Sequence, residues 1–323
     1  MGVFVFLPLV LPLSAWPIAR LAEQHLHPRT ATRLLTAVAG VCALCSTLCL
    51  ALLVVVGTAQ LPGNPLPDGW SDPEVREAVP YDEVAGKTAI PALLGVLVAC
   101  LRALWRDRRT RRRAVRALAG LRPTSVAVLP DPVPYAYALP VGPAGGRGCR
   151  RLGTRCGGRI VVTTGMLSGL APAERRALFA HERAHLTSRH HRYLLVVRLA
   201  ELANPALRPL RSAVGYTSER WADEEAAAAV GSRRVVARAI GKAALTSRGV
   251  PVPVPGPAAA VGPVPRRVAA LLGPTPAVRS WPPLSTTVGL ATWCAAAGTT
   301  ASALSSANSA VTLFLILKAA TPL

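Results

Sequence analysis

Residues 34–56 read LLTAVAGVCALCSTLCLALLVVV, an apolar run that contains no charged side chain. A helix needs about 20 mostly apolar residues to cross the hydrocarbon core of a bilayer, and this run is long enough. Three further runs approach that length: residues 3–19, residues 88–104 and a longer run within residues 286–317. The last run favours one tilted helix over a hairpin, because no turn signal divides it. The sequence therefore predicts four transmembrane helices.

The composition agrees with a membrane protein. The chain has 323 residues with 37 Lys+Arg against 16 Asp+Glu, a formal net charge of +21, yet 51% of its residues are hydrophobic. A soluble nucleic-acid-binding protein usually carries more charge and fewer apolar runs, and a disordered basic tail would not be half hydrophobic. A basic balance on an apolar chain is typical of a membrane protein whose cations lie on one side. We therefore expect contact with the lipid bilayer and no binding of nucleic acid.

Loop charges predict the orientation. Residues 57–87 carry six acidic and two basic side chains, whereas residues 106–116 carry seven arginines directly after the third apolar run. Lys and Arg near the ends of spans favour the cytoplasmic side. This rule puts the 57–87 loop and both termini outside, and the Arg-rich segment 106–122 in the cytoplasm, next to anionic lipid.

The pattern divides the chain into parts, with one stretch long enough for a cytoplasmic domain. That stretch contains β-prone pieces at 125–129, 135–139 and 159–163, and helical patterns at 172–202, 218–229 and 232–245. The expected fold is therefore a mostly α membrane protein with a cytoplasmic α+β domain that holds a small sheet with edge strands. The expected parts are 1–121 with three transmembrane helices, 122–248 with the cytoplasmic domain, 249–284 as a Pro-rich linker with one short helix at 266–272, and 285–323 with the last transmembrane helix.

The cytoplasmic domain contains His181-Glu182-Arg183-Ala184-His185, an HExxH motif. Residues four apart on a helix lie on nearly the same face, so both imidazoles can reach one zinc ion. Glu182 can then act as general base on a water whose pKa the zinc lowers. An HExxH pattern also arises by chance on solvated helices, so the prediction depends on a third ligand.

The third ligand has several downstream candidates: His190, His191, Glu201, Glu219, Asp223, Glu224 and Glu225. Glu219 and Asp223 lie four apart and so share a helix face. Glu219 can complete a His-His-Glu site while Asp223 accepts a proton from the outer nitrogen of a ligand histidine. His190 lies off the ligand face of the HExxH helix. We expect one Zn²⁺ per chain.

Five segments in this order resemble the BlaR/MecR-type integral-membrane zinc metallopeptidases and, more distantly, the HtpX/CAAX-protease gluzincins. They are residues 134–140, 160–167, 174–185, the pair Asn204-Pro205, and residues 219–223. The resemblance implies a gluzincin-type zinc metallopeptidase of zincin-like fold in a bacterial plasma membrane, with ligands His181, His185 and Glu219. It implies Glu182 as general base and Asp223 as a supporting residue behind the ligands. It also implies that one strand borders the substrate cleft and pairs with an extended peptide. The residues of that strand are Tyr135, Ala136, Tyr137, Ala138 and Leu139.

The expected activity is cleavage of a cytoplasmic or membrane-proximal protein, such as a transcriptional repressor in a signalling pathway. An HtpX-like quality-control protease and a non-catalytic receptor or scaffold are the alternatives. The antibiotic sensors carry a penicillin-binding domain after the last span, but this sequence has no Ser-x-x-Lys motif, so we expect no covalent β-lactam sensing by it. Four residues are candidates for stabilising the oxyanion: Tyr216, His191, Tyr193 and Arg220.

Overall fold

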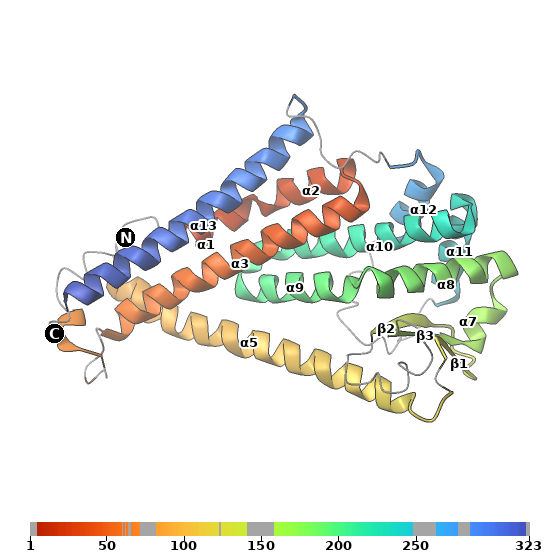
Figure 1. The fold of residues 1–323 in the computed structure, drawn as a ribbon, viewed down its shortest axis with the longest axis horizontal. Helices are drawn as coiled ribbons and strands as arrows, with labels where there is room; N and C mark the ends of the chain where they lie inside the picture. Colours follow the sequence, from red (N-terminus) through yellow and green to blue (C-terminus); the bar gives the residue numbers. More distant parts are fainter. Residues whose placement is uncertain are drawn as a thin grey trace.

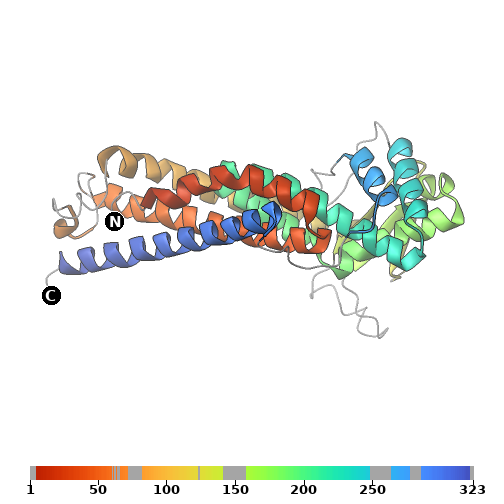
Figure 2. The same cartoon turned by 90° about the horizontal axis from the view of Figure 1, so that it is seen from above.

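The computed structural model describes residues 5–59, 61, 63, 66–71, 82–122, 124–140, 158–247, 263–276 and 285–320. The molecule is elongated and mostly helical (Figures 1 and 2), with long helices at one end and a small sheet among shorter helices at the other. Residues 72–81 of the predicted 57–87 loop and much of the predicted linker lie outside the described residues.

Three helices in the described part of the chain are long and apolar enough to cross a membrane. They are α3 (Pro28–Ala59), the stretch Val84–Ala117 of α5 (Asp82–Ala117), and the stretch Gly289–Ala319 of α13 (Thr287–Ala319). The second, third and fourth predicted spans lie in these helices, and the last forms one helix. The arginines of 106–116 continue α5 beyond its apolar part, so the same helix carries both features.

The first predicted span is not a single helix, which corrects the expectation of four. Residues 7–25 form α1 (Leu7–Val10), the 3₁₀ helix η2 (Leu11–Ser14) and α2 (Ala15–His25). Pro8 and Pro12 each stand at the start of one of these pieces. Proline has no N–H to donate and clashes with the preceding turn, so it favours such restarts over a continuous helix.

The helices α3 and α5 cross in close contact through two glycines. A Cβ built on Gly57 would lie 2.3 Å from the carbonyl carbon of Gly86. Small residues let helix backbones approach in a membrane, where association depends on packing. This crossing therefore requires glycine.

A hairpin of α9 (His190–Ala203) and α10 (Arg208–Val230) packs against α2 and α3, joined by the 3₁₀ helix η5 (Pro205–Leu207). Figure 1 shows both arms running between α3 and α5. The core of this contact includes Leu35 and Ala39 of α3 with Val197 and Leu210 of the hairpin. The hairpin thus lies among the membrane-length helices, and α10 begins ten residues before the helix predicted at 218–229.

The helix predicted over 172–202 is two helices. The HExxH helix α8 (Pro172–Thr187) ends before Arg189, whose φ of 55° places it in the left-handed region. L-residues rarely adopt this conformation, and periodicity alone does not reveal it. The break turns the chain from α8 into α9.

The sheet is small and mixed. Strands β1 (Val126–Leu129), β2 (Ala136–Pro140) and β3 (Gly158–Thr163) lie in the order β1-β3-β2. β1 pairs in parallel with β3, and β2 pairs antiparallel with it, with Ala138 opposite Ile160. β1 and β2 are therefore edge strands, as the flanking prolines predicted.

Three shorter helices complete the end that carries the sheet: α7 (Thr164–Ser168), α11 (Arg233–Thr246) and α12 (Val264–Leu272). α12 lies within the predicted linker and includes the short helix expected at 266–272. Its Leu271 is buried in a core with Ala177 of α8 and Val236 of α11. This part of the linker sequence therefore packs into the fold.

Candidate metal centre

The helix α8 holds the two histidines of the HExxH motif one turn apart. Pro172 occupies its first turn, and the Glu174 carboxylate accepts hydrogen bonds from the Ala171 N–H and Lys242 Nζ, each at 2.8 Å. The Nε2 atoms of His181 and His185 lie 3.1 Å apart. Two imidazole nitrogens therefore meet at one point, as the i, i+4 spacing predicts.

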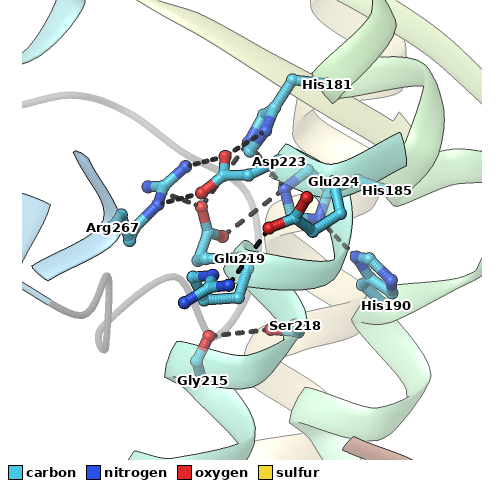
Figure 3. Close-up of polar contacts among 10 residues, drawn as sticks. His181, His185, His190, Gly215, Ser218, Glu219, Asp223, Glu224 and Arg267 are labelled. Carbon is cyan, nitrogen blue, oxygen red and sulfur yellow. Dashed lines mark hydrogen bonds and ion pairs between the residues drawn. The ribbon is translucent and has the colours of Figure 1, made fainter. Parts of the chain in front are cut away.

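Glu219 of α10 reaches the same point from the facing helix (Figure 3). Its Oε2 lies 3.5 Å from His181 Nε2, and its Oε1 lies 3.4 Å from His185 Nε2. The three residues form a group whose ligand atoms all lie within 4.8 Å of one another. Two imidazoles and one carboxylate are a donor set that zinc accepts in catalytic sites, so the residues fit this metal.

Asp223 contacts His181 at the ring nitrogen that faces away from the ligand cluster. Its Oδ1 lies 3.0 Å from His181 Nδ1, and its side chain has no exposed surface. Asp223 also accepts hydrogen bonds from Arg267 of α12, from Nε at 2.8 Å and from Nη2 at 2.6 Å. Arg267 Nη1 lies 2.9 Å from Glu219 Oε2. The guanidinium thus joins the two carboxylates of α10.

His190 supports the second histidine. Its Nδ1 lies 2.9 Å from His185 Nδ1, and its ring packs against Trp221 at 4.6 Å between centroids. The sequence placed His190 off the ligand face, and it is not a member of the metal-binding group. Its contact with the outer nitrogen of His185 was missed, because it depends on the left-handed turn at Arg189.

The other acidic candidates have partners outside this centre. Glu201 forms an ion pair with Arg211. Glu224 pairs with Arg220 at 3.1 Å and with Arg233 at 2.8 Å. Glu225 accepts hydrogen bonds from Trp221 and Ser188. Of the four oxyanion candidates, Arg220 is engaged by Glu224, and Tyr216 lies under Arg266, whose guanidinium carbon is 4.3 Å from the ring centroid.

Burial and charge set the protonation of the centre. Burial raises the pKa of Glu182 to about 7, against the opposing effect of His181. Burial lowers the pKa of His185 to about 4. Burial opposes ionisation of Glu219, but His185 and Arg267 outweigh it and hold its pKa well below the usual range. A neutral His185 and an ionised Glu219 are the forms that bind metal.

The strand β2 lies along Glu182. The backbone of Ala138 lies close enough to Glu182 to lower the pKa of its carboxyl group, and Tyr135 and Ala136 line a cavity of about 250 Å³. Leu139, by contrast, is fully buried in the core. The rest of the cavity wall is mostly apolar and includes the site residues themselves: Met166, Ala177, Leu178, His181, Glu182, Val236, Ala239, Ile240, Ala243, Ala244, Ser247, Val264 and Arg267.

Helices of membrane length, an HExxH helix and a His-His-Glu cluster together define a membrane metallopeptidase. Residues 101–204, about a third of the chain, match the family model described as Peptidase family M48. The matched range includes His181, Glu182 and His185 and ends before Glu219. No curated protein and no solved structure matches the chain.

Proposed function

We propose that this protein is a membrane-embedded zinc endopeptidase with His181, His185 and Glu219 as metal ligands and Glu182 as general base. The observation that carries the proposal is the convergence of the three ligand atoms beside a fourth residue, the buried acid Glu182. When bound there, zinc would polarise the substrate carbonyl and lower the pKa of a bound water to about 7.

The chain's own residues would move the proton and orient the ligands. Glu182, with its pKa near 7, would accept a proton from the attacking water and pass it to the leaving amine. Asp223 and His190 would hold the rings of His181 and His185 through their outer nitrogens.

The edge strand β2 supports binding of an extended peptide. One edge of β2 pairs with β3, and the Ala138 backbone faces Glu182. A substrate that adds to this edge would run past the catalytic glutamate and place a side chain in the adjoining apolar cavity. We therefore assign Tyr135, Ala136, Tyr137 and Ala138 to substrate binding, and Leu139 to anchoring the strand in the core.

The charge pattern supports a cytoplasmic site in a bacterial plasma membrane. The arginines of 106–116 lie in the part of α5 that is nearest the sheet, at the end of the molecule that also contains the metal centre (Figure 1). Clustered arginines favour the cytoplasmic side. The substrate would then be a cytoplasmic or membrane-proximal protein. The resemblance to BlaR/MecR-type peptidases favours a transcriptional repressor in a signalling pathway.

The replacement Glu182→Gln tests the catalytic proposal. Loss of a general base lowers rates by about 10²–10⁴-fold, so we expect cleavage to fall in that range while zinc stays bound. Glu201→Gln removes an acid outside the centre and is the matched control. The wild-type protein, purified in detergent, should contain zinc that His181→Ala loses. A fully active Glu182→Gln variant, or a wild-type protein that binds no zinc, would overturn the proposal.

A proteomic comparison of cells that carry wild-type or Glu182→Gln protein separates the regulatory function from the quality-control alternative. Accumulation of one intact DNA-binding protein with the variant supports the repressor substrate. Accumulation of many membrane proteins supports quality control. No difference between the strains, with zinc bound in the wild-type protein, favours a receptor or scaffold.

A further inference from the structure

The helix α12 contributes a buried arginine to the metal centre (Figure 3). Arg267 is 4% exposed, and its three nitrogens all face carboxylates. Nε and Nη2 contact the two oxygens of Asp223, and Nη1 contacts Glu219 Oε2. The planar guanidinium fork binds carboxylates with a fixed geometry. Arg267 therefore restrains two acidic side chains of α10 together.

The contact leaves the metal-facing atoms in defined places. Arg267 takes Oε2 of Glu219, while Oε1 faces His185 Nε2 at 3.4 Å. In Asp223, Oδ1 lies against both Arg267 Nη2 and His181 Nδ1. One arginine thus sets the orientation of a ligand carboxylate and of the carboxylate behind a ligand histidine.

Charge balance gives the arginine a second effect. Glu182, Glu219 and Asp223 place up to three negative charges in a buried site. Buried charges are costly unless they are paired. One divalent cation and one guanidinium together balance three carboxylates, so Arg267 compensates the charge that a single metal ion would leave.

The C-terminal end of α12 is held against α11. Arg233 of α11 donates to the Gly273 and Ala270 carbonyls at its C-terminal end, each at 2.8 Å. At the other end, the neighbouring Arg266 pairs with Glu23 of α2 at 3.0 Å. Adjacent arginines therefore point to different partners, one toward the membrane helices and one toward the metal centre.

We propose that Arg267 is a positioning residue of the zinc site, which holds Glu219 and Asp223 in the orientation that binds the metal. This proposal rests on the proposed function only in taking zinc as the metal. It assigns a role in the site to a helix that begins 45 residues beyond Glu219, the last ligand in the sequence.

Zinc affinity of the full chain in detergent, measured by competition with a chelator, tests the proposal independently of peptidase activity. Removal of groups that orient metal ligands costs about 10–100-fold in affinity, and we expect this loss for Arg267→Met. Arg266→Met is the matched control, since it makes the same change on the same helix away from the ligands. It should stay within about threefold of wild type. The Arg267→Met/Asp223→Asn double variant should lose little more than the worse single variant, because the two residues act through one contact.

Arg267→Lys keeps the charge but not the fork, and it serves if the Met variant does not fold. We expect it to rescue affinity only in part, leaving a loss of at least about threefold. Wild-type affinity in a folded Arg267→Lys or Arg267→Met protein, or equal losses in the Arg266 and Arg267 variants, would overturn the positioning role while leaving the zinc peptidase intact. Absence of zinc from the wild-type protein would instead overturn the proposed function.

Discussion

Asn204, at the tip of the α9–α10 hairpin, should be a measurable anchor between the hairpin and the membrane helices. Its Nδ2 donates to Ser46 Oγ of α3 at 3.0 Å and to the Leu9 carbonyl at 3.3 Å. Its Oδ1 accepts from the Ala206 N–H at 3.1 Å, which caps the 3₁₀ turn. The side chain is only 8% exposed. Asn204→Ala therefore removes three hydrogen bonds from a buried site.

The magnitude follows from those bonds. A hydrogen bond contributes about 1 kcal/mol in soluble proteins, and bonds between membrane helices average about 0.6 kcal/mol. Asn204→Ala should therefore lower the free energy of unfolding by about 2 kcal/mol. Ser46 Oγ keeps its own donation to the Pro8 carbonyl at 2.7 Å, so the share that couples Asn204 to Ser46 should be about 0.6–1 kcal/mol.

A double-mutant cycle of Asn204→Ala and Ser46→Ala, followed by unfolding in detergent micelles, measures that coupling. Thr47→Ala is the control, because among the residues that the structure describes the Thr47 hydroxyl bonds within its own helix, to the Ala43 carbonyl at 2.8 Å. Its effect should add to that of Asn204→Ala. Additivity within about 0.3 kcal/mol for the Asn204–Ser46 pair would show that this bond does not anchor the hairpin.

Three further outcomes follow from other parts of the structure. Gly86→Ala should lower thermal stability by separating α3 from α5 at Gly57. Gly95→Ala is the control on the same helix, because its new Cβ meets no described atom within 4 Å, and it should be neutral or stabilising. Equal melting temperatures for the two variants would contradict the close crossing. The pKa of Glu174 is lowered, first by its hydrogen bond with Lys242, so its carboxylate stabilises the fold above pH about 4.5 and loses that effect as pH falls through the lower folded value. The melting temperature should therefore drop less between pH 7 and pH 4 in Glu174→Gln than in wild type. An identical drop would argue against a stabilising hydrogen bond between Glu174 and Lys242. Chelation should abolish peptidase activity, and added zinc should restore it; activity that persists after complete metal removal would refute the metallopeptidase mechanism.

The parts of the centre that the sequence reveals are those set by local periodicity. The i, i+4 spacing places His181 with His185 and Glu219 with Asp223, since a helix repeats its face after about one turn. That rule needs no knowledge of tertiary packing. The convergence of the two pairs does need it, because the path of the chain through α9 decides whether the faces of α8 and α10 meet.

The contacts of Arg267 and His190 cannot be predicted from residue spacing within one helix. Arg267 belongs to a short helix in a Pro-rich stretch, and no spacing in the sequence connects it with the ligands. His190 reaches His185 only because Arg189 takes a left-handed conformation. The error in the first predicted span has a different cause, since hydropathy records the length of the span but not the effect of its prolines on a continuous helix.

The metal centre and the membrane helices are parts of one packed unit. Thr217, two residues before the proposed ligand Glu219, shares a buried hydrogen bond of 2.9 Å with Thr32 near the start of α3. Further along α10, Leu210 packs against Leu35 of the same membrane helix. The α10 helix that carries Glu219 is thus seated on α3, whereas His181 stands on α8. A rearrangement of the membrane helices that moves α10 relative to α8 would therefore change the distance between Glu219 and His181.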